Sequence, residues 1–335
     1  MTNNDYVISN NISQSKLKDL LYNPLIYKKR WIDKTLDNKE SEFMKLGSAV
    51  DCKLTDSINF DNQFIIADFS SITDSVKILT DYLITEFNDK MIVDDDELIY
   101  YIQQLKLYGN IKKKEVFIDN LHKYNFFDYY KMRFESKNKS ILTTIEYNKV
   151  NAFVESLLTN EFTSKYFYPE EGIEIVNQQS IYWNCNQLDC KSLLDFIIIN
   201  HNDKTITPVD LKKSSFDTNI FIKSIYKYRL DIQAAFYTDA LINYISTSKK
   251  LQDYKINNFE FLVENIEYPG SPLIWVMTDD DLNIGRNGGL LNNRKVKGYL
   301  DLIKQLDWHL TTDIWNYTPE LYENKGKIWC DFENR

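Results

Sequence analysis

A predicted β-hairpin with charged residues in its strands constrains this chain more than any other feature. Residues 191–215 read KSLLDFIIINHNDKTITPVDLKKSS, two strand-forming runs joined by the turn-forming cluster NHND. The first run carries Asp195 among apolar neighbours, and the second carries Asp210 with Lys212 two residues later. Because a strand points residues i and i+2 to the same face, Asp210 and Lys212 project together, and strand pairing can bring Asp195 beside them.

The charges in this hairpin need compensation. Two carboxylates and a lysine on one face of otherwise apolar strands cost several kcal/mol of desolvation when nothing balances them. A divalent metal ion is the obvious compensator, so the hairpin predicts a metal site with Asp195 and Asp210 as ligands. The alternative is a purely structural salt bridge between Asp210 and Lys212 at a sheet edge.

Length and composition are those of an ordinary globular protein. The chain has 335 residues, of which 43% are hydrophobic and 27% charged, enough for one elaborated domain or two. No internal repeat or low-complexity linker is evident, which favours a single domain over 1–335. No apolar run approaches the roughly 20 residues that span a bilayer, and the polar N-terminus lacks signal-peptide features. We therefore expect a cytoplasmic protein with no membrane segment.

Net charge and cysteine spacing argue against some classes of function. The net charge of -9 disfavours a protein coated in basic surface that wraps nucleic acid, but it leaves room for a local basic channel. The four cysteines include no CxxC pair, so neither a zinc site nor a disulfide framework is indicated. Reduced structural thiols are expected.

Helical and strand-like segments surround the hairpin. Helical periodicity is predicted within 13–55 and, in a charged and aromatic region, over 71–140. Strand-like runs precede and follow the hairpin inside 141–310. We therefore expect an α/β (α+β) fold with a central mixed, largely antiparallel sheet flanked by helices. The N-terminal helices would pack on this core, and 71–140 would form a helical insertion.

Two further groups of polar residues lie on predicted helices. Asp51 follows Gly47 by one helical turn, on a face that another element can approach closely, although a merely exposed Asp fits the same pattern. Gln233 and Tyr237 are also one turn apart, so they share a helix face.

Basic residues form two candidate contacts for an anionic substrate. Lys28 and Arg30 adjoin Trp31, a combination that suits phosphate contact, although a solvated helix face is the alternative. Arg286 and Arg294 belong to a basic region late in the chain. Either group could contribute to a local basic channel.

The order of these motifs resembles a known superfamily. Asp195, then Asp210-Leu211-Lys212, then a helix with Gln233 and Tyr237 is similar to the PD-(D/E)xK nucleases. More narrowly, the chain resembles phage and prophage exonucleases of the RecE (exonuclease VIII) type and the wider RecB-like group. LGSAVDCKL occupies the place of the family's Gly-x-x-x-His helix, QQSIYW that of its Glu-containing strand, and DIQAAFYTDAL that of its Gln-x-x-x-Tyr helix. The resemblance covers most of the chain and implies a restriction-endonuclease-like core.

Two positions depart from the family pattern. Asp51 replaces the family's His, and it can still bind a hard cation through oxygen. Gln179 or Gln178 replaces the family's Glu, and neither can carry its negative charge. The chain also lacks the C-terminal cysteine trio of iron–sulfur members, so no cluster is expected.

The resemblance implies a role for each candidate residue. Asp195, Asp210 and the backbone carbonyl of Leu211 would bind Mg²⁺ or Mn²⁺, with Asp51 as a further ligand. Lys212 would orient the attacking water or stabilise the transition state, and Gln233 and Tyr237 would position the nucleophile or the DNA backbone. The candidate substrate contacts are Lys28, Arg30, Gln179, Lys213, Arg286 and Arg294.

The implied function is metal-dependent exonucleolytic digestion of duplex DNA ends, in phage-type recombination, DNA processing or DNA repair. The resemblance also implies a ring-like homo-oligomer that works with a single-strand annealing recombinase, in the bacterial cytoplasm or, for a phage-encoded protein, in the host cytoplasm. A RecB-like endonuclease and a catalytically silent DNA-binding or assembly protein are the alternatives.

Overall fold

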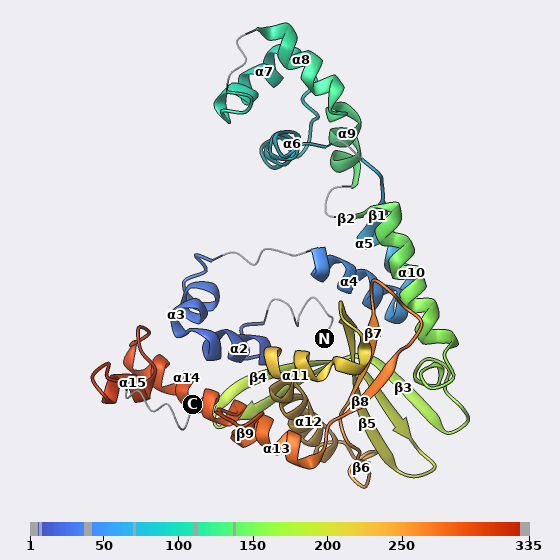
Figure 1. The fold of residues 1–335 in the computed structure, drawn as a ribbon, viewed down its shortest axis with the longest axis vertical. Helices are drawn as coiled ribbons and strands as arrows, with labels where there is room; N and C mark the ends of the chain where they lie inside the picture. Colours follow the sequence, from blue (N-terminus) through green and yellow to red (C-terminus); the bar gives the residue numbers. More distant parts are fainter. Residues whose placement is uncertain are drawn as a thin grey trace. The chain divides into compact units, whose positions relative to one another are not determined.

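The computed structural model describes residue 6 and residues 9–36, 42–69, 72–109, 113–136 and 139–328. Contacts divide the chain into two units, Met1–Gly47 with Ala152–Arg335, and Ser48–Asn151. The first unit contains the predicted hairpin (Figure 1). In the part of the chain that the structure describes, no helix combines the length and apolarity needed to cross a membrane.

A mixed sheet forms the centre of the first unit. Its strands are β3 (Ile173–Cys185), β4 (Leu188–Asn200), β5 (Thr205–Ser214), β6 (Lys255–Ile256), β7 (Glu260–Asn265) and β8 (Leu273–Val276). The order is β3-β4-β5-β7-β8, and β6 pairs with β5 outside this path. Only the pairings of β5 with β6 and β7 are parallel, because helices connect β5 to these later strands. The expected fold class, a mostly antiparallel sheet flanked by helices, is confirmed.

One long helix covers the face of the sheet that carries the candidate site. The α-helices that lie wholly in the first unit are α2 (Gln14–Tyr22), α3 (Pro24–Tyr27), α11 (Ile222–Tyr228), α12 (Leu230–Ser246), α13 (Asp279–Asn287), α14 (Tyr299–Thr312) and α15 (Pro319–Glu323). The unit also has a π-helical turn at Lys28–Ile32 and 3₁₀ turns at Ser164–Tyr166 and Thr218–Ile220. Strands β9 (Gly289–Leu291) and β10 (Arg294–Val296) form a separate hairpin. Helix α12 contacts β3, β4 and β5 as well as α2, α13 and α14. Every residue from Leu230 to Thr238 is buried, so the polar side chains in that run need internal partners.

The N-terminal segment attaches to the free edge of β4. Ile12 forms a parallel bridge with Cys190: its N–H donates to the Asp189 carbonyl, and its own carbonyl accepts from the Lys191 N–H, both at 2.8 Å. Immediately afterwards Ser13 caps α2 by accepting a hydrogen bond from the Lys16 N–H. The start of α2 is thereby fixed beside the first half of β4.

The second unit is mainly helical and buries an apolar cluster of its own. Its helices are α5 (Phe60–Gln63), α6 (Asp74–Glu86), α7 (Asp95–Gln104), α8 (Lys114–Lys123) and α9 (Phe126–Ser136), with a 3₁₀ turn at Ser57–Asn59. Strands β1 (Phe64–Ile66) and β2 (Ser140–Leu142) pair in parallel. Helices α4 (Glu42–Thr55) and α10 (Thr144–Thr159) each belong partly to the first unit and partly to the second. Side chains from α6, α7, α8 and α9 form the cluster. These helices fall within 71–140, the segment predicted as a helical insertion; that the whole chain acts as one domain stays a prediction.

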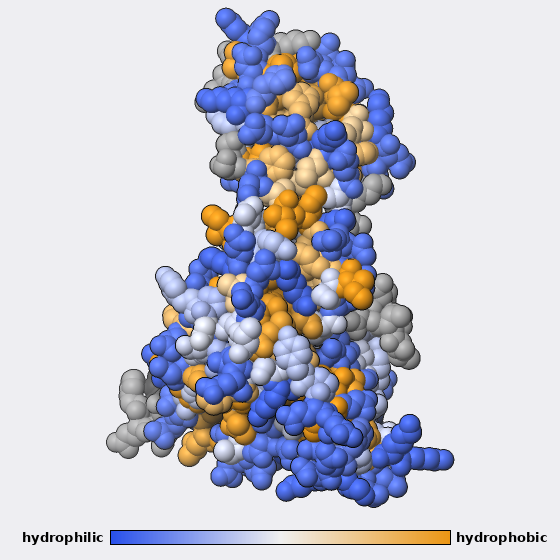
Figure 2. All heavy atoms as spheres, turned by 90° about the vertical axis from the view of Figure 1, so that its right-hand side faces the viewer, coloured by the Kyte–Doolittle hydropathy of each residue, from blue (hydrophilic) through white to orange (hydrophobic). Residues whose placement is uncertain are grey.

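Some large apolar side chains are exposed, among them Tyr22, Ile58 and Tyr268. On the face shown in Figure 2, hydrophilic residues predominate and the apolar ones occur in small groups. Other apolar side chains form the buried clusters of the two units. Exposed apolar residues that occur singly are normal on a protein surface.

The contact between α12 and α13 predicts the effect of a single methyl group. A Cβ added at Gly285 would lie 2.0 Å from the Asp231 carbonyl oxygen and 3.0 Å from Ala235 Cβ. Gly285→Ala should therefore lower the free energy of unfolding by about 1–3 kcal/mol, despite the higher helix propensity of Ala. Urea denaturation measures the change. Gly109→Ala is the matched control, because its Cβ would meet nothing within 4 Å; equal stability of the two variants would contradict the prediction.

Buried His309 predicts acid sensitivity of the first unit. Its Nδ1 contacts the Ile314 carbonyl, its Nε2 lies 3.3 Å from Gln305 Nε2, and its ring stacks on Trp315, which assigns a neutral imidazole with Nδ1 protonated. Burial lowers the pKa of His309 below its usual 6.5. Below about pH 6.5 the unfolded chain therefore binds a proton that the folded chain rejects, and stability falls as the pH falls.

Unfolding in urea between pH 8 and pH 6 tests this effect, since carboxylates titrate little in that range. His309→Phe keeps a ring for stacking but cannot titrate, so its stability should depend less on pH than that of the wild type. A variant with unchanged pH dependence would show that His309 is not responsible.

Candidate active site at the divergence of two strands

Strands β4 and β5 pair for only part of their length. Their ladder ends at Phe196↔Val209, after which β5 continues beside β7 and β4 continues beside β3. Asp195 and Asp210 are the next residues on the two diverging strands. The predicted carboxylates therefore occur where the hairpin ladder stops.

Where β4 separates from β5, the Asp195 side chain accepts the hydrogen bond that the β4 backbone would accept in a continuous ladder. Its Oδ2 accepts from the Leu211 backbone N–H at 2.9 Å, and its Oδ1 accepts from Gln178 Nε2 at 3.3 Å. Gln178 has a φ of 51° and lies opposite Asp195, between the pairs Asn177↔Phe196 and Gln179↔Leu194. This register places Gln178, rather than Gln179, in contact with Asp195.

Asp210 and Lys212 point to the same face of β5, as their i, i+2 spacing predicts. Asp210 is 3% exposed; its Oδ1 accepts a hydrogen bond from Gln233 Nε2 at 2.6 Å, and its Oδ2 forms an ion pair with Lys212 Nζ. Gln233 comes from α12, so the helix and the sheet hold this carboxylate between them. Since Asp195 bonds the next peptide N–H along β5, the structure brings Asp195, Asp210, Lys212 and Gln233 together.

Tyr237 lies one turn after Gln233 on α12 and is buried. Burial raises the pKa of Tyr237 well above its ordinary value, and the proximity of Tyr6, Asp210 and Asp195 adds to the shift. The phenol therefore keeps its proton at neutral pH. It can donate a hydrogen bond near the two carboxylates, but it cannot serve as a general base.

A lysine that the sequence analysis did not single out belongs to the same surroundings. Lys18, on α2, is partly exposed as a residue. Burial of its amine, reinforced by the charge of Lys212, lowers the pKa of Lys18 to about 7, while Asp210 and Asp231 oppose the shift. The sequence carried no signal for Lys18, because only the packing of α2 against α12 brings it to these charges.

The first predicted basic group is paired with acids. Lys28 Nζ lies 3.4 Å from Asp33 Oδ1, and Arg30 NH1 lies 2.6 Å from Asp19 Oδ1. Asp19 also accepts a hydrogen bond from the indole N–H of Trp31. Arg30 and Trp31 are therefore held by α2, and their predicted contact with substrate remains a prediction.

The other predicted basic contacts have varied surroundings. Arg286 binds Asp239 through both Nε, at 2.7 Å, and its terminal nitrogen. Arg294 is exposed on β10. Lys213 Nζ donates to the Gly47 carbonyl at 3.2 Å, from the opposite face of β5 to that of Lys212. Its role as a substrate contact remains a prediction.

The donor set suits a hard divalent cation such as Mg²⁺ or Mn²⁺. Oδ2 of Asp210 is buried and accepts no hydrogen bond of good geometry from a described residue; the Lys212 ammonium balances its charge. No cluster of three or more His, Cys, Asp or Glu side chains able to hold a metal occurs among the described residues. Mg²⁺ commonly completes its shell with backbone carbonyls, waters and substrate phosphates, so Asp195 and Asp210 fit such an ion. The Leu211 carbonyl and Asp51, which lies in the second unit, remain predicted ligands.

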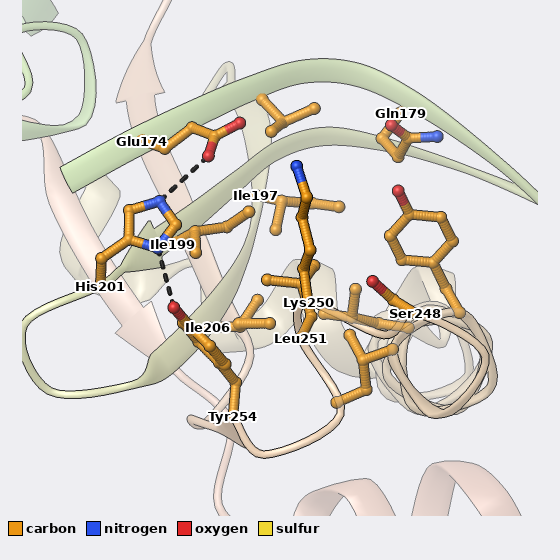
Figure 3. A pocket seen from close by; sticks show the side chains of 14 residues that line it. Glu174, Gln179, Ile197, Ile199, His201, Ile206, Ser248, Lys250, Leu251 and Tyr254 are labelled. Atoms are coloured by element: carbon orange, nitrogen blue, oxygen red, sulfur yellow. Dashed lines mark hydrogen bonds and ion pairs between the residues drawn. The ribbon is translucent and has the colours of Figure 1, made fainter. Parts of the chain in front are cut away.

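A separate cavity of about 410 Å³ lies between the sheet and the end of α12, toward the β4–β5 turn (Figure 3). His201 lines the cavity and contacts two other lining residues: its Nε2 lies 3.1 Å from Glu174 Oε2, and its Nδ1 lies 2.8 Å from the Tyr254 hydroxyl. Gln179 lines this cavity. The two neighbouring glutamines of β3 thus have different surroundings, with Gln178 at Asp195 and Gln179 at the cavity.

Comparisons with known proteins assign no family. No protein-family model matches the chain, and no curated protein matches it. A solved structure from Eubacterium rectale, described as a "Putative exonuclease", aligns over 99% of this chain and 95% of its own length, with 11% sequence identity and a TM-score of 0.49. A similarity this low assigns no activity to the present chain.

The hydrogen bond between Leu211 and Asp195 predicts that two substitutions differ in stability. Asp195→Ala leaves the buried Leu211 N–H without its acceptor, which should lower the free energy of unfolding by about 1–3 kcal/mol. Asp195→Asn retains a carbonyl oxygen and should cost less. Denaturant titration of both variants measures the difference, and indistinguishable midpoints would contradict a structural role for this bond.

Proposed function

We propose that this chain is a metal-dependent nuclease that hydrolyses phosphodiester bonds of DNA. The observation that carries the proposal is the convergence of Asp195, Asp210, Lys212 and Gln233 where β4 and β5 diverge. Phosphodiester hydrolysis concentrates negative charge on phosphate oxygens. A site with oxygen donors for a cation and a lysine beside them is suited to stabilising that charge.

Each side chain has a proposed role. Asp195 and Asp210 would hold Mg²⁺ or Mn²⁺, with the Leu211 carbonyl and Asp51 as further ligands. When bound, the ion supplies Lewis-acid stabilisation of charge on the phosphate. Gln233 fixes the orientation of the Asp210 carboxylate through its hydrogen bond.

Two donors complete the proposed mechanism. Lys212 presents an ammonium group, at present paired with Asp210, which can stabilise negative charge that develops on the scissile phosphate. Tyr237 keeps its phenolic proton and would orient the attacking water or a backbone phosphate by donating a hydrogen bond. Neither role requires either group to accept a proton.

The finer proposal is exonucleolytic digestion of duplex ends in phage-type recombination, DNA processing or DNA repair. The order of motifs along the chain, which resembles RecE-type exonucleases, supports it. Under this proposal the protein is a cytoplasmic homo-oligomer that works with a single-strand annealing recombinase, and the DNA contacts are Lys28, Arg30, Gln179, Lys213, Arg286 and Arg294.

One observation favours a second candidate function. Gln178, an amide, contacts Asp195 near the place where the family has a Glu, so the site has one negative charge fewer. A catalytically silent DNA-binding protein would tolerate this loss. A RecB-like endonuclease is the remaining alternative, and it differs from the exonuclease in cutting closed circular DNA.

Cleavage assays on the full chain test these functions. Linear and closed circular duplexes are incubated with Mg²⁺, Mn²⁺ or EDTA, using the wild type, Asp210→Asn and the control Asp253→Asn, which removes an exposed carboxylate outside the site. We expect cation-dependent degradation of linear DNA only. Asp210→Asn should lower the rate at least about a hundredfold, because the site loses a negatively charged ligand of the cation that stabilises the transition state, while Asp253→Asn should match the wild type.

The other outcomes separate the alternatives. Cleavage of the circular substrate would identify an endonuclease. DNA binding without cleavage under either cation would identify the silent binding protein. A protein that neither binds nor cleaves DNA would overturn the proposal.

A further inference from the structure

Helix α2 is held firmly against the centre of the first unit. Its start is fixed by the bridge between Ile12 and Cys190 on β4. Leu17 and Leu20 are fully buried in the apolar cluster that also contains side chains of α12. The position of α2 against the first unit is therefore fixed at its start and along its apolar side.

The side of α2 that carries Gln14 and Lys18 faces the carboxylate site. These residues are one helical turn apart and share a face. Gln14 lies within hydrogen-bonding reach of the Tyr237 phenol, near the middle of α12. Lys18 lies among Asp210, which is bonded to Gln233, and residues at the start of α12. Helix α2 contacts α12 directly, so Gln14 and Lys18 approach the site from the α2 side.

The charges around Lys18 leave it without a partner of its own. Asp231 is paired with Arg229: the Arg229 Nε and terminal nitrogen lie 3.0 and 2.8 Å from the Asp231 carboxylate oxygens. Asp210 forms an ion pair with Lys212 and accepts a hydrogen bond from Gln233. No hydrogen bond or ion pair joins Lys18 to any residue that the structure describes.

Gln14 also has a polar atom without a hydrogen-bond partner. Its Oε1 is buried and accepts no hydrogen bond within the described part of the chain. One helix face thus presents an unpaired ammonium and an unsatisfied amide oxygen beside the proposed reaction site. A buried cation without a counter-charge is costly to maintain unless an anionic ligand pairs with it, whereas the Gln14 oxygen is an acceptor that a phosphodiester does not satisfy.

We propose that Lys18 is a substrate-positioning residue that binds a non-bridging phosphate oxygen of the nucleic-acid strand beside the Asp210–Lys212 pair. A phosphodiester is the anion that the proposed function brings to this place, so the inference rests on that function. Lys18 would hold the strand from the α2 side while Lys212 acts from the sheet. Gln14 would assist indirectly, by holding the Tyr237 phenol.

Binding measurements without turnover test the role of Lys18. Fluorescence anisotropy of a short labelled duplex is followed in EDTA at several KCl concentrations, using the full chain. Lys18→Met should weaken binding about tenfold and reduce the slope of log Kd against log salt by about 0.9, the loss of one phosphate contact. Lys18→Arg should restore both quantities. Lys223→Met, which removes an exposed lysine on α11, is the control for net charge and should match the wild type.

Thermal denaturation establishes that each variant is folded, and Lys18→Gln replaces Lys18→Met if the latter is not. Unchanged affinity and salt slope in Lys18→Met or Lys18→Gln, with a wild type that binds and cleaves DNA, would overturn this inference alone. A wild type that neither binds nor cleaves DNA would overturn the proposed function. An equal loss in Lys223→Met would reduce the effect of Lys18 to general charge and would also overturn the inference.

Discussion

A backbone N–H that bonds to a side chain instead of a neighbouring strand is the contact on which this site depends. Leu211 donates to Asp195, and this bond satisfies a buried donor at the point where β4 leaves β5. Without it the divergence would leave a polar group unpaired in the core. The same bond places the Asp195 carboxylate beside the peptide that follows Asp210. The architecture of the sheet and the placement of the acids thus have one physical cause.

Comparison with another buried acid shows why Asp210 is unusual. Glu264, on β7, is fully buried, and it accepts hydrogen bonds from the N–H groups of Asn265 and Gly270 and from the Ser156 hydroxyl. Its oxygens are saturated by neutral donors, as a structural carboxylate requires. Asp210 accepts a hydrogen bond from one neutral donor, Gln233, and its other oxygen is paired with the Lys212 ammonium. The two acids are equally deep, but only Asp210 is arranged so that its charge can be shared with a ligand.

The hairpin and its charged face could be predicted because they follow from local rules. Alternation along β5 places Asp210 with Lys212, and helical spacing places Gln233 with Tyr237. The irregular and long-range features could not be predicted. The register of β3 against β4 decides which glutamine contacts Asp195, and no sequence pattern marks a non-glycine residue with positive φ such as Gln178. Lys18 was missed because the packing of α2 on α12 cannot be predicted from the sequence of either helix alone.

The attachment of the N-terminal segment to β4 has a consequence for how the molecule assembles. Lys191 Nζ donates to the carbonyl of Ser9 at 2.7 Å, across a separation of 182 residues. Closing so long a loop costs entropy before the contact returns any stability, and non-local pairings of this kind are slow to form. During synthesis, α2 emerges long before the strand against which it docks. The N-terminal segment therefore stays undocked until β4 has been made, and α2 can pack beside the two acids of the hairpin only after this long-range contact forms.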